Sequence, residues 1–447
     1  MTESLICGPS TRWFMDSHSN RYRRSTALLE RALKTIPLGS QTFSKSHISY
    51  PQGQAPLFLT HGKGAHVWDV DGNEYIDLVN GLLPVVLGYG DPDVDAAVTR
   101  QMEKGVTFSL AVEHEIELAE KLVELIPCAE MVRFGKNGSD ATAGAIRLAR
   151  AHTGRDRVAV CGYHGWQDWY IGSTARHVGV PDAVRSLTHT FVYNDLESLD
   201  RLLTSHPGEF AAVIMEPMTM VEPVCGYLAG VKDMAHANGA VLVFDEIITG
   251  FRFDIGGLQA QCGVVPDLAT FGKSMANGYP ISAVVGRADI MKGMEEIFFS
   301  FTFGGEALSL AAALATIEKM QCEPVLETIR LRGTALRDGL SELITHHEVG
   351  SFVSVTGRPE WSMIVIDDVE DTTSWEIKTL FLQEMLARGV LILGSHNVSY
   401  SLDEDDLNTV LSAYDEVLGI LSSAWKNNDF RNRLHSPPLE PLFRVRG

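Results

Sequence analysis

Two side chains of opposite charge, Asp245 and Lys273, each follow a short apolar run in this sequence. Residues 241–246 (VLVFDE) end on two carboxylates, and residues 268–274 (LATFGKS) end with a glycine, a lysine and a serine. A lysine amine can form a Schiff base with an aldehyde cofactor, and pyridoxal phosphate (PLP) also needs a carboxylate partner for its pyridinium nitrogen. The pair therefore favours PLP chemistry, against the alternative that Asp245 caps a turn and Lys273 is a solvated surface lysine.

The two apolar runs are typical of strands that are buried on both faces of a parallel sheet. Ligands bind just beyond the carboxyl ends of such strands, so neighbouring strands would bring both charges into one crevice. Between residues 131 and 286 the chain alternates strand-like and helix-like segments, and further strand-like runs are 131–134, 157–165, 190–195, 211–217 and 281–286. We therefore expect an α/β fold with a mostly parallel central sheet covered by helices.

The flanking segments predict a smaller α+β domain built from both ends of the chain. Residues 67–78 alternate around Asp71 and Gly72, which indicates a hairpin. A last helix is expected to start near Ser401, with Ser401 and Glu404 as a capping box. The expected parts are residues 1–90 (N-terminal segment, part of the small domain), 91–310 (large PLP-binding domain), 311–424 (C-terminal small domain) and 425–447 (a polar, loosely ordered tail).

A glycine-containing segment, residues 135–140 (GKNGSD), lies between a strand-like run and a helix-like run. Asn137, Gly138 and Ser139 could present backbone N–H groups and short polar side chains to a phosphate at a helix N-terminus. Gly138 would allow close approach of the backbone. The alternative is an ordinary Asn-Gly turn with an N-cap, and the strand-end acid and amine favour the phosphate site over it.

Four more residues are candidates for contact with the ring. Tyr163 follows a strand and could stack on one face of a pyridine, while Ile247 would cover the other face. His164 alone is compatible with a structural histidine, and Glu216, at another strand end, could position groups or form a salt bridge. An aromatic side chain after a strand is also common in a core.

Composition excludes several other classes of protein. The chain has 447 residues and a net charge of −20, which argues against nucleic acid or an anionic membrane surface as partner. Six scattered cysteines without a CxxC pair give no metal signature and favour reduced thiols in a cytoplasmic protein. We see no signal-peptide pattern and no apolar run of roughly 20 residues that would span a membrane.

Taken together, VLVFDEIITGFR and GGLQAQCGVVPDLATFGKSMANGYPISAVVGR resemble the signature of class III PLP-dependent aminotransferases of fold type I. Within that class the sequence is most similar to glutamate-1-semialdehyde 2,1-aminomutase, from the hairpin at residues 67–78 to the C-terminal part. The resemblance implies that Lys273 carries PLP and moves a proton between the substrate Cα and C4′ of the cofactor. It also implies that Asp245 keeps the ring nitrogen protonated.

The same resemblance implies that Tyr163 stacks on the ring and that Asn137, Gly138 and Ser139 hold the phosphate. Thr302 matches a threonine that family members contribute to the phosphate of the neighbouring subunit, so a homodimer with shared active sites is expected.

The sequence departs from the aminomutase pattern on the substrate side. Leu82 replaces a tryptophan, and Ser44 and Lys45 lie in an altered N-terminal loop. Near the C-terminal strand Gly394 replaces a glutamate and is followed by Ser395, His396 and Asn397. We therefore expect Ser44, Lys45, Leu82, His396 and Asn397 on the substrate side. Lys45, Arg252 and Arg358 are possible anion partners, although structural roles are favoured for each.

These departures favour an intermolecular aminotransferase that uses a small-molecule amino donor and a carbonyl acceptor, such as a keto-sugar or nucleotide-sugar. The alternative is the aminomutase reaction, in which the amino group moves within one molecule. An NTPase is disfavoured because FGKS lacks the earlier glycine of a Walker A loop, position 267 being Asp267. A PLP-fold protein that has lost catalysis is disfavoured by the presence of both Asp245 and Lys273.

Overall fold

A seven-stranded sheet with the order β4-β10-β9-β8-β7-β5-β6 forms the centre of the computed structural model, which describes residues 21–441. Its strands are β4 (Met131–Gly135), β5 (Arg157–Cys161), β6 (Thr188–Thr190), β7 (Phe210–Met215), β8 (Val241–Asp245), β9 (Leu268–Phe271) and β10 (Ser282–Gly286). Within this sheet β10 runs antiparallel to both of its neighbours, β4 and β9, and the other pairings are parallel. The prediction of a mostly parallel sheet is confirmed.

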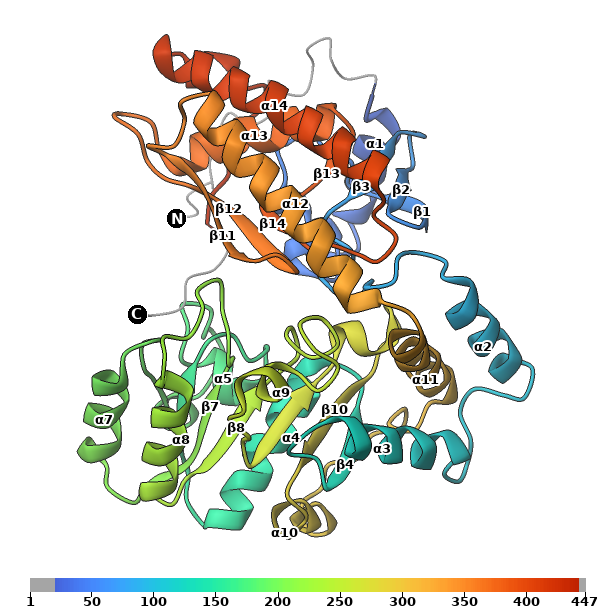
Figure 1. Ribbon diagram of the computed structural model, residues 1–447, viewed down its shortest axis with the longest axis vertical. Coiled ribbons are helices and arrows are strands. Elements are labelled where there is room, and N and C mark those ends of the chain that lie inside the picture. Colours follow the sequence, from blue (N-terminus) through green and yellow to red (C-terminus); the bar gives the residue numbers. More distant parts are fainter. Residues whose placement is uncertain (1–20, 442–447) are drawn as a thin grey trace, which may run out of the picture.

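Both faces of this sheet are buried, which explains the continuous apolar runs. Along β8, Leu242 and Phe244 belong to one hydrophobic core and Val241 and Val243 to another. Helix α4 (Gly138–Thr153) packs across β7, β8, β9 and β10 on one face. The remaining helices of this lower half in Figure 1 are α2 (Pro92–Met102), α3 (Glu113–Leu125), α5 (Asp168–Ile171), α6 (Asp182–Arg185), α7 (Leu196–Ser205), α8 (Tyr227–Ala237), α9 (Leu258–Cys262), α10 (Ala288–Met291) and α11 (Ala307–Cys322).

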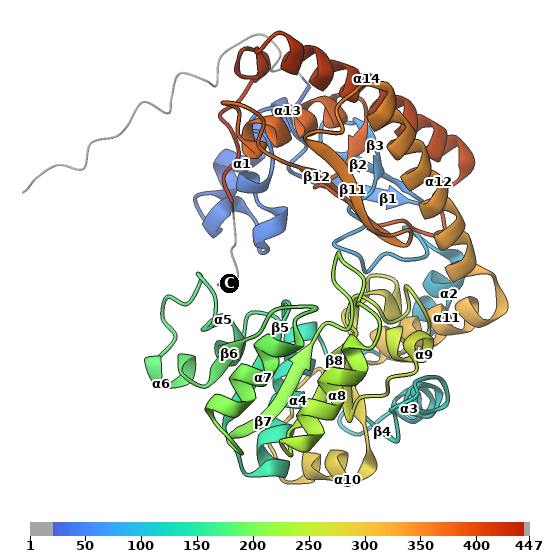
Figure 2. The same ribbon diagram turned by 60° about the vertical axis from the view of Figure 1, so that its left-hand side comes forward.

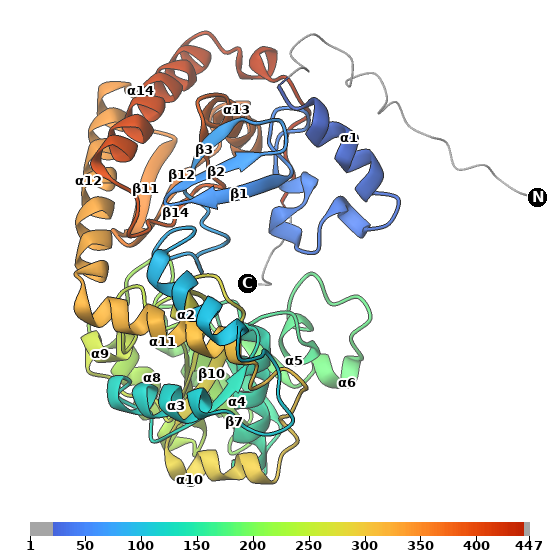
Figure 3. The ribbon, with the colours of Figure 1, turned by 90° about the vertical axis from the view of Figure 1, so that its right-hand side faces the viewer.

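Segments from both ends of the chain build the other half, where the blue and the orange-to-red elements lie side by side (Figures 1 and 3). A four-stranded sheet joins β1 (Leu59–Lys63), β2 (His66–Asp69) and β3 (Glu74–Asp77) to β13 (Val390–Leu391), and a three-stranded sheet contains β11 (Val353–Arg358), β12 (Trp361–Ile366) and β14 (Ser395–His396). The helices here are α1 (Arg23–Ala32), α12 (Val325–His346), α13 (Ser374–Ala387) and α14 (Glu404–Lys426). Figure 2 shows α12, α13 and α14 on the outside of these sheets.

Local chemistry explains where two elements begin or end. The hairpin of β2 and β3 turns at Asp71 and Gly72, as predicted, with Gly72 at a positive φ of 90°. The predicted strand at residues 190–195 is wrong beyond Thr190, because the side chain of Asp195 accepts a hydrogen bond from the backbone N–H of Ser198 (3.0 Å) and caps α7.

The N-cap of α14 also differs from the prediction. Asp403, not Ser401, caps this helix: its side chain accepts from the backbone N–H of Asp406 (2.9 Å), and the side chain of Asp406 accepts from the backbone N–H of Asp403 (3.2 Å). The Ser401 hydroxyl is instead hydrogen-bonded to the hydroxyl of Ser399 (3.1 Å). Aspartate is as good an N-cap as serine, so sequence spacing alone did not separate the two candidates.

Residues 427–441 are ordered, so the prediction of a loosely ordered tail is wrong for this part. Phe430 is buried, and the Arg431 guanidinium forms an ion pair with Glu376 on α13 (2.5 Å). The backbone N–H of Leu439 donates to the Thr379 hydroxyl (2.8 Å). The tail therefore packs along α13. Residues 442–447 lie outside the described residues.

The five cysteines among the described residues form no disulfide. Cys128, Cys161, Cys225, Cys262 and Cys322 are free thiols, and Cys7 lies outside the described residues. Across residues 21–441, no helix combines the length and the apolar character needed to cross a bilayer.

Candidate active site

The segments that follow five strands of the large sheet line one cavity of about 740 Å³. Asn137 follows β4, Tyr163 follows β5, Glu216 follows β7, Asp245 ends β8 and Lys273 follows β9. The strand-end acid and amine therefore share one cavity, because β8 and β9 are parallel neighbours.

Asp245 is held rigidly by three partners. Its Oδ2 lies 2.7 Å from Nδ1 of the buried His164, and its Oδ1 accepts from the backbone N–H of Ile247 and the hydroxyl of Thr270, both at 3.2 Å. The other ring nitrogen of His164 lies 3.1 Å from the carbonyl oxygen of Cys161. The imidazole thus links the Asp245 carboxylate to the backbone at the end of β5. This network fixes the orientation of the Asp245 carboxylate.

Thr270 was not among the predicted site residues. Its only sequence signal is a hydroxyl within the otherwise apolar run of β9, and its role depends on β9 lying beside β8.

Lys273 has the electrostatic environment of a nucleophile. Burial lowers the pKa of its ammonium group, although the carboxylates of Glu216 and Asp245 partly oppose this effect. Its backbone lies in the left-handed region (φ 41°), where a side chain other than glycine is strained. A neutral amine is the reactive form for attack on an aldehyde.

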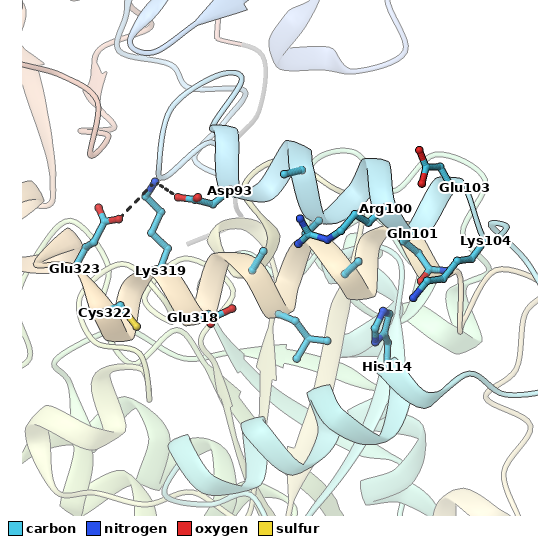
Figure 4. A pocket seen from close by; sticks show the side chains of 15 residues that line it. Asp93, Arg100, Gln101, Glu103, Lys104, His114, Glu318, Lys319, Cys322 and Glu323 are labelled. Carbon is cyan, nitrogen blue, oxygen red and sulfur yellow. Dashed lines mark hydrogen bonds and ion pairs between the residues drawn. The ribbon is translucent and has the colours of Figure 1, made fainter.

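A second cavity, of about 730 Å³, lies between α2, α3 and α11 and contains another lysine, Lys319 (Figure 4). The ammonium of Lys319 lies 2.6 Å from Asp93 and 2.9 Å from Asp91. Burial disfavours its charge, but these hydrogen bonds outweigh that effect and raise its pKa. Lys319 is thus held as a cation in an ion-pair network, and the reactive amine is that of Lys273.

The N-terminus of α4 lies at the first cavity, whose lining includes Asn137, Gly138 and Ser139. Asn137 caps the helix: its side chain accepts from the backbone N–H of Asp140 (3.1 Å), and the side chain of Asp140 accepts from the backbone N–H of Asn137 (3.1 Å). A Cβ on Gly138 would lie 2.7 Å from Cδ1 of Ile247, so any larger residue here would displace the Ile247 side chain. The Ser139 hydroxyl accepts from the backbone N–H of Trp166 (3.2 Å).

Tyr163, Ile247 and Glu216 complete the cofactor end of the cavity. Tyr163 is about half exposed towards it, and its backbone N–H donates to Glu216 Oε2 (2.9 Å). Burial and the nearby Asp245 carboxylate raise the pKa of Glu216 to about 7. Glu216 therefore positions the Tyr163 segment and can hold a proton near neutral pH.

This pKa predicts a pH dependence of stability. Since the folded state binds a proton at Glu216 that an ordinary glutamate has lost, the contribution of Glu216 to the free energy of unfolding of the apoprotein decreases as pH rises from about 4.5 to about 7. The Glu216→Gln variant lacks this decrease. We expect its Tm relative to wild type to increase by about 2–5 °C between pH 4.5 and 7.5. Thermal unfolding of both apoproteins across this range measures the difference, and parallel curves would contradict it.

Part of the cavity lining is apolar and comes from outside the strand ends. Pro84, Met220, Trp361 and Met363 form this part, and they come from the N-terminal segment, the segment after β7 and strand β12. Sequence reasoning missed these residues, because nothing in their local sequence marks them as neighbours of β8 and β9.

The residues predicted for the substrate side lie elsewhere. His396 is buried, with Nδ1 2.8 Å from the Ser362 hydroxyl and Nε2 2.6 Å from the Tyr414 hydroxyl. The Asn397 amide donates to the carbonyl oxygen of Val79 (2.8 Å). Both side chains thus tie the small half together.

The other three predicted substrate-side residues, Ser44, Lys45 and Leu82, are also absent from the cavity lining. Ser44 and Lys45 belong to a short 3₁₀ turn (Phe43–Lys45), and Leu82 packs in a core of the N-terminal segment. Thr302 does not line the cavity of its own chain either. It lies between Phe301 and Phe303 in the segment before α11.

The residues present fit PLP. The start of the 16-residue helix α4 lies at the cavity. A Cβ on Gly138 would come close to Ile247 there. A carboxylate fixed by an imidazole and an amine with a lowered pKa lie beyond it. Asn137, Gly138 and Ser139 would hold the phosphate, Tyr163 and Ile247 the ring faces, Asp245 the ring nitrogen, and Lys273 the aldehyde carbon.

Comparisons with known proteins agree with this fit. The family profile described as "Aminotransferase class-III" matches residues 48–416. The chain is 36% identical over 405 residues to 3-aminobutyryl-CoA aminotransferase of Cloacimonas acidaminovorans (strain Evry), covering 88% of this chain and 96% of that protein. It is 35% identical over 422 residues to glutamate-1-semialdehyde 2,1-aminomutase of Alkaliphilus oremlandii (strain OhILAs), covering 89% and 98%.

Among solved structures, the PLP internal aldimine form of the FumI protein of Sphingopyxis sp. MTA144 superposes with a TM-score of 0.83 at 31% identity, covering 90% of this chain and 98% of that chain. Sequence, fold and strand-end chemistry therefore agree, and the chain belongs to the class III aminotransferase family as a PLP-dependent enzyme of fold type I.

Proposed function

We propose that this enzyme transfers amino groups between two molecules, and that its main substrate is a primary amine, or the matching carbonyl compound, with an uncharged and mainly apolar body. PLP supplies an electron sink when bound. The protein's own contribution is a fixed carboxylate at Asp245 and a buried amine of lowered pKa at Lys273 that can carry a proton.

One observation carries the proposal. Among the described residues that line the cavity, Lys136 and Lys273 are the only lysines, and there is no arginine. The Lys136 ammonium is already paired with Glu306 (3.0 Å), and Lys273 serves the chemistry. A substrate carboxylate would therefore lie against Trp361 and Met363 without a cationic partner. Burying an unpaired charge is costly, so a substrate without a free carboxylate is favoured.

The relative with 36% identity agrees with one part of this proposal, the absence of a substrate carboxylate. 3-Aminobutyryl-CoA carries its acyl carbon as an uncharged thioester, and the charged phosphate groups of its CoA part lie far from the amine. Glutamate-1-semialdehyde, which appears in the name of the other relative, has a free carboxylate, and that group would lack a cationic partner in the cavity. The aminomutase reaction is therefore only the second candidate. The keto-sugar acceptor favoured by the sequence has less support, because His396 and Asn397 bind other protein groups.

A single-turnover screen tests the proposed substrate class. The PLP form would be mixed with one amine at a time, and conversion to the pyridoxamine form followed by absorbance. We expect an aromatic or aliphatic monoamine to react with a second-order rate constant at least about 10-fold above that of L-glutamate, because one unpaired charge costs at least ~1.4 kcal/mol.

The same screen includes the competing substrates. If an amino-sugar reacts fastest, the sugar acceptor is correct. If glutamate-1-semialdehyde alone is processed without an external donor, the aminomutase reaction is correct.

We also propose a homodimer in which Thr302 contributes to the partner's phosphate site. Support comes from large apolar side chains that are exposed in the single chain, including Leu110 (85%), Ile116 (60%), Phe298 (81%) and Phe303 (58%). Large apolar side chains with this degree of exposure favour burial by another copy. Sedimentation equilibrium should give about twice the chain mass of 49.0 kDa. The free thiols support the further proposal of a cytoplasmic location.

A further inference from the structure

Arg252 is a fully buried arginine whose hydrogen bonds go to backbone carbonyl groups. Nη1 donates to the carbonyl oxygens of Val398 (2.9 Å) and Glu360 (3.1 Å), and Nη2 donates to that of Leu83 (3.0 Å). Burial lowers the pKa of its guanidinium to about 10, and the Glu360 carboxylate partly opposes this effect. Burying a charge is unfavourable unless hydrogen bonds compensate for it, so a guanidinium here needs these three acceptors.

The three carbonyl groups belong to segments that are far apart in the sequence. Arg252 follows β8 of the large sheet, whereas Leu83 follows β3, Glu360 lies between β11 and β12, and Val398 follows β14. Figure 1 shows β8 in the lower half and β11, β12 and β14 in the upper half. One planar side chain therefore connects the lower half to two parts of the upper half.

Two of these carbonyl groups immediately precede walls of the substrate end of the cavity. Leu83 is followed by Pro84, and Glu360 is followed by Trp361, and both Pro84 and Trp361 line the cavity. The guanidinium therefore holds both wall residues through the peptide groups next to them.

The backbone beside Pro84 is strained, which gives the hydrogen bond from Arg252 a specific task. Leu82 and Leu83 have φ values of 78° and 84°, in the region that disfavours side chains other than glycine. Such a conformation persists only when its surroundings hold it. The carbonyl oxygen of Leu83 also accepts from the hydroxyl of Ser274 (3.3 Å), the residue after Lys273. The strained turn is thus tied to the reacting end of the cavity.

We propose that Arg252 is a positioning residue that sets the distance between the Pro84 and Trp361 walls and so determines which substrate bodies fit. This inference rests on the proposed function, because it assigns the apolar end of the cavity to the substrate. Arg252 also affects Lys273. Burial is the main cause of the lowered pKa of Lys273, and the positive charge of Arg252 lowers that pKa further.

The test uses the PLP-loaded enzyme with Arg252→Met and Arg252→Lys. Methionine removes all three donors, while lysine keeps the charge but loses the planar fork that reaches two sides at once. Arg155→Met is a matched control: Arg155 also donates to two backbone carbonyl groups, those of Phe210 (3.2 Å) and Asn238 (2.6 Å), and it does not line the cavity.

Steady-state kinetics would compare a small aliphatic amine with an aromatic amine. For each variant, the value of kcat/KM for the aromatic amine is divided by that for the small amine. In Arg252→Met we expect this ratio to change at least about 10-fold, mainly because KM changes. A 10-fold change corresponds to ~1.4 kcal/mol. Arg252→Lys should shift the ratio in the same direction, and Arg155→Met should leave it within about twofold. Calorimetric binding of the alcohol analogue of the aromatic amine should weaken in parallel in the Arg252 variants.

The outcomes separate the inference from the proposed function. If Arg252→Lys and Arg252→Met lower Tm as Arg155→Met does but leave the ratio and the binding of the analogue unchanged, Arg252 has only a structural role and the inference is wrong. If Arg252→Met does not fold, the kcat/KM ratio of Arg252→Lys decides whether Arg252 has the positioning role or only a structural one. If the wild-type enzyme transfers no amino group from either amine, the proposed substrate class fails first.

Discussion

Replacing Lys273 with alanine is expected to lower the rate constant for amino transfer by about 10⁴-fold or more. The variant loses a covalent attachment point and the group that carries a proton between the substrate and the cofactor, and proton transfer by a positioned side chain alone contributes about 10²–10⁴-fold. No other lysine is in a position to substitute, since Lys136, the other lysine lining the cavity among the described residues, is paired with Glu306.

Two measurements check this prediction. Borohydride reduction of the PLP-loaded protein, followed by peptide mass spectrometry, should place the reduced cofactor on Lys273 in the wild type and nowhere in Lys273→Ala. Lys378→Ala is the matched control, because burial also lowers the pKa of Lys378, which lies over the ring of Trp375 on α13 (5.3 Å) and away from the cavity. Turnover by Lys273→Ala close to that of Lys378→Ala would refute the role assigned to Lys273.

The second large effect is expected at Asp245. Asp245→Asn should lower kcat by about 10³-fold, in line with the loss of one preorganised electrostatic contact in a buried site. Asparagine has no negative charge to stabilise a protonated ring nitrogen. The amide would also face Nδ1 of His164, which donates to the carboxylate at 2.7 Å in the wild type. The absorbance spectrum of bound PLP should change, because it reports the protonation of the ring.

The chain contains a close control for this substitution. Asp267 is also buried, accepts from the backbone N–H of Leu242 (2.8 Å), and pairs with His236 (2.9 Å) and Arg287 (2.9 Å) outside the cavity. Asp267→Asn should lower Tm and leave kcat and the PLP spectrum of the folded enzyme nearly unchanged. Equal losses of kcat in both variants would show that Asp245 acts through stability instead of through the cofactor.

Substrate choice and chemistry depend on different parts of the molecule. The cofactor end is built from the ends of neighbouring strands, whereas the substrate end depends on how the N-terminal segment and β12 are held against the large sheet by Arg252.

Local sequence patterns were enough to predict the large sheet and the acid and the amine at its strand ends. The apolar runs that end at Asp245 and Lys273 predicted neighbouring buried strands, and the segment around Gly138 predicted the start of a helix; the structure contains all three. Such features are encoded locally, since burial on both faces requires a continuous apolar run and a helix start requires a capping residue.

The apolar part of the cavity lining could not be predicted from local patterns and became visible with the packing of the two halves. His396 looked available for a ligand in the sequence but is hydrogen-bonded to Ser362 and Tyr414, whereas Pro84 and Trp361 carried no local signal and line the cavity. Arg252 could equally have bound an anion until the fold brought three distant carbonyl groups around it. The physical reason is that these contacts join segments many residues apart, so they depend on how the two halves pack and not on the residues nearest in the chain.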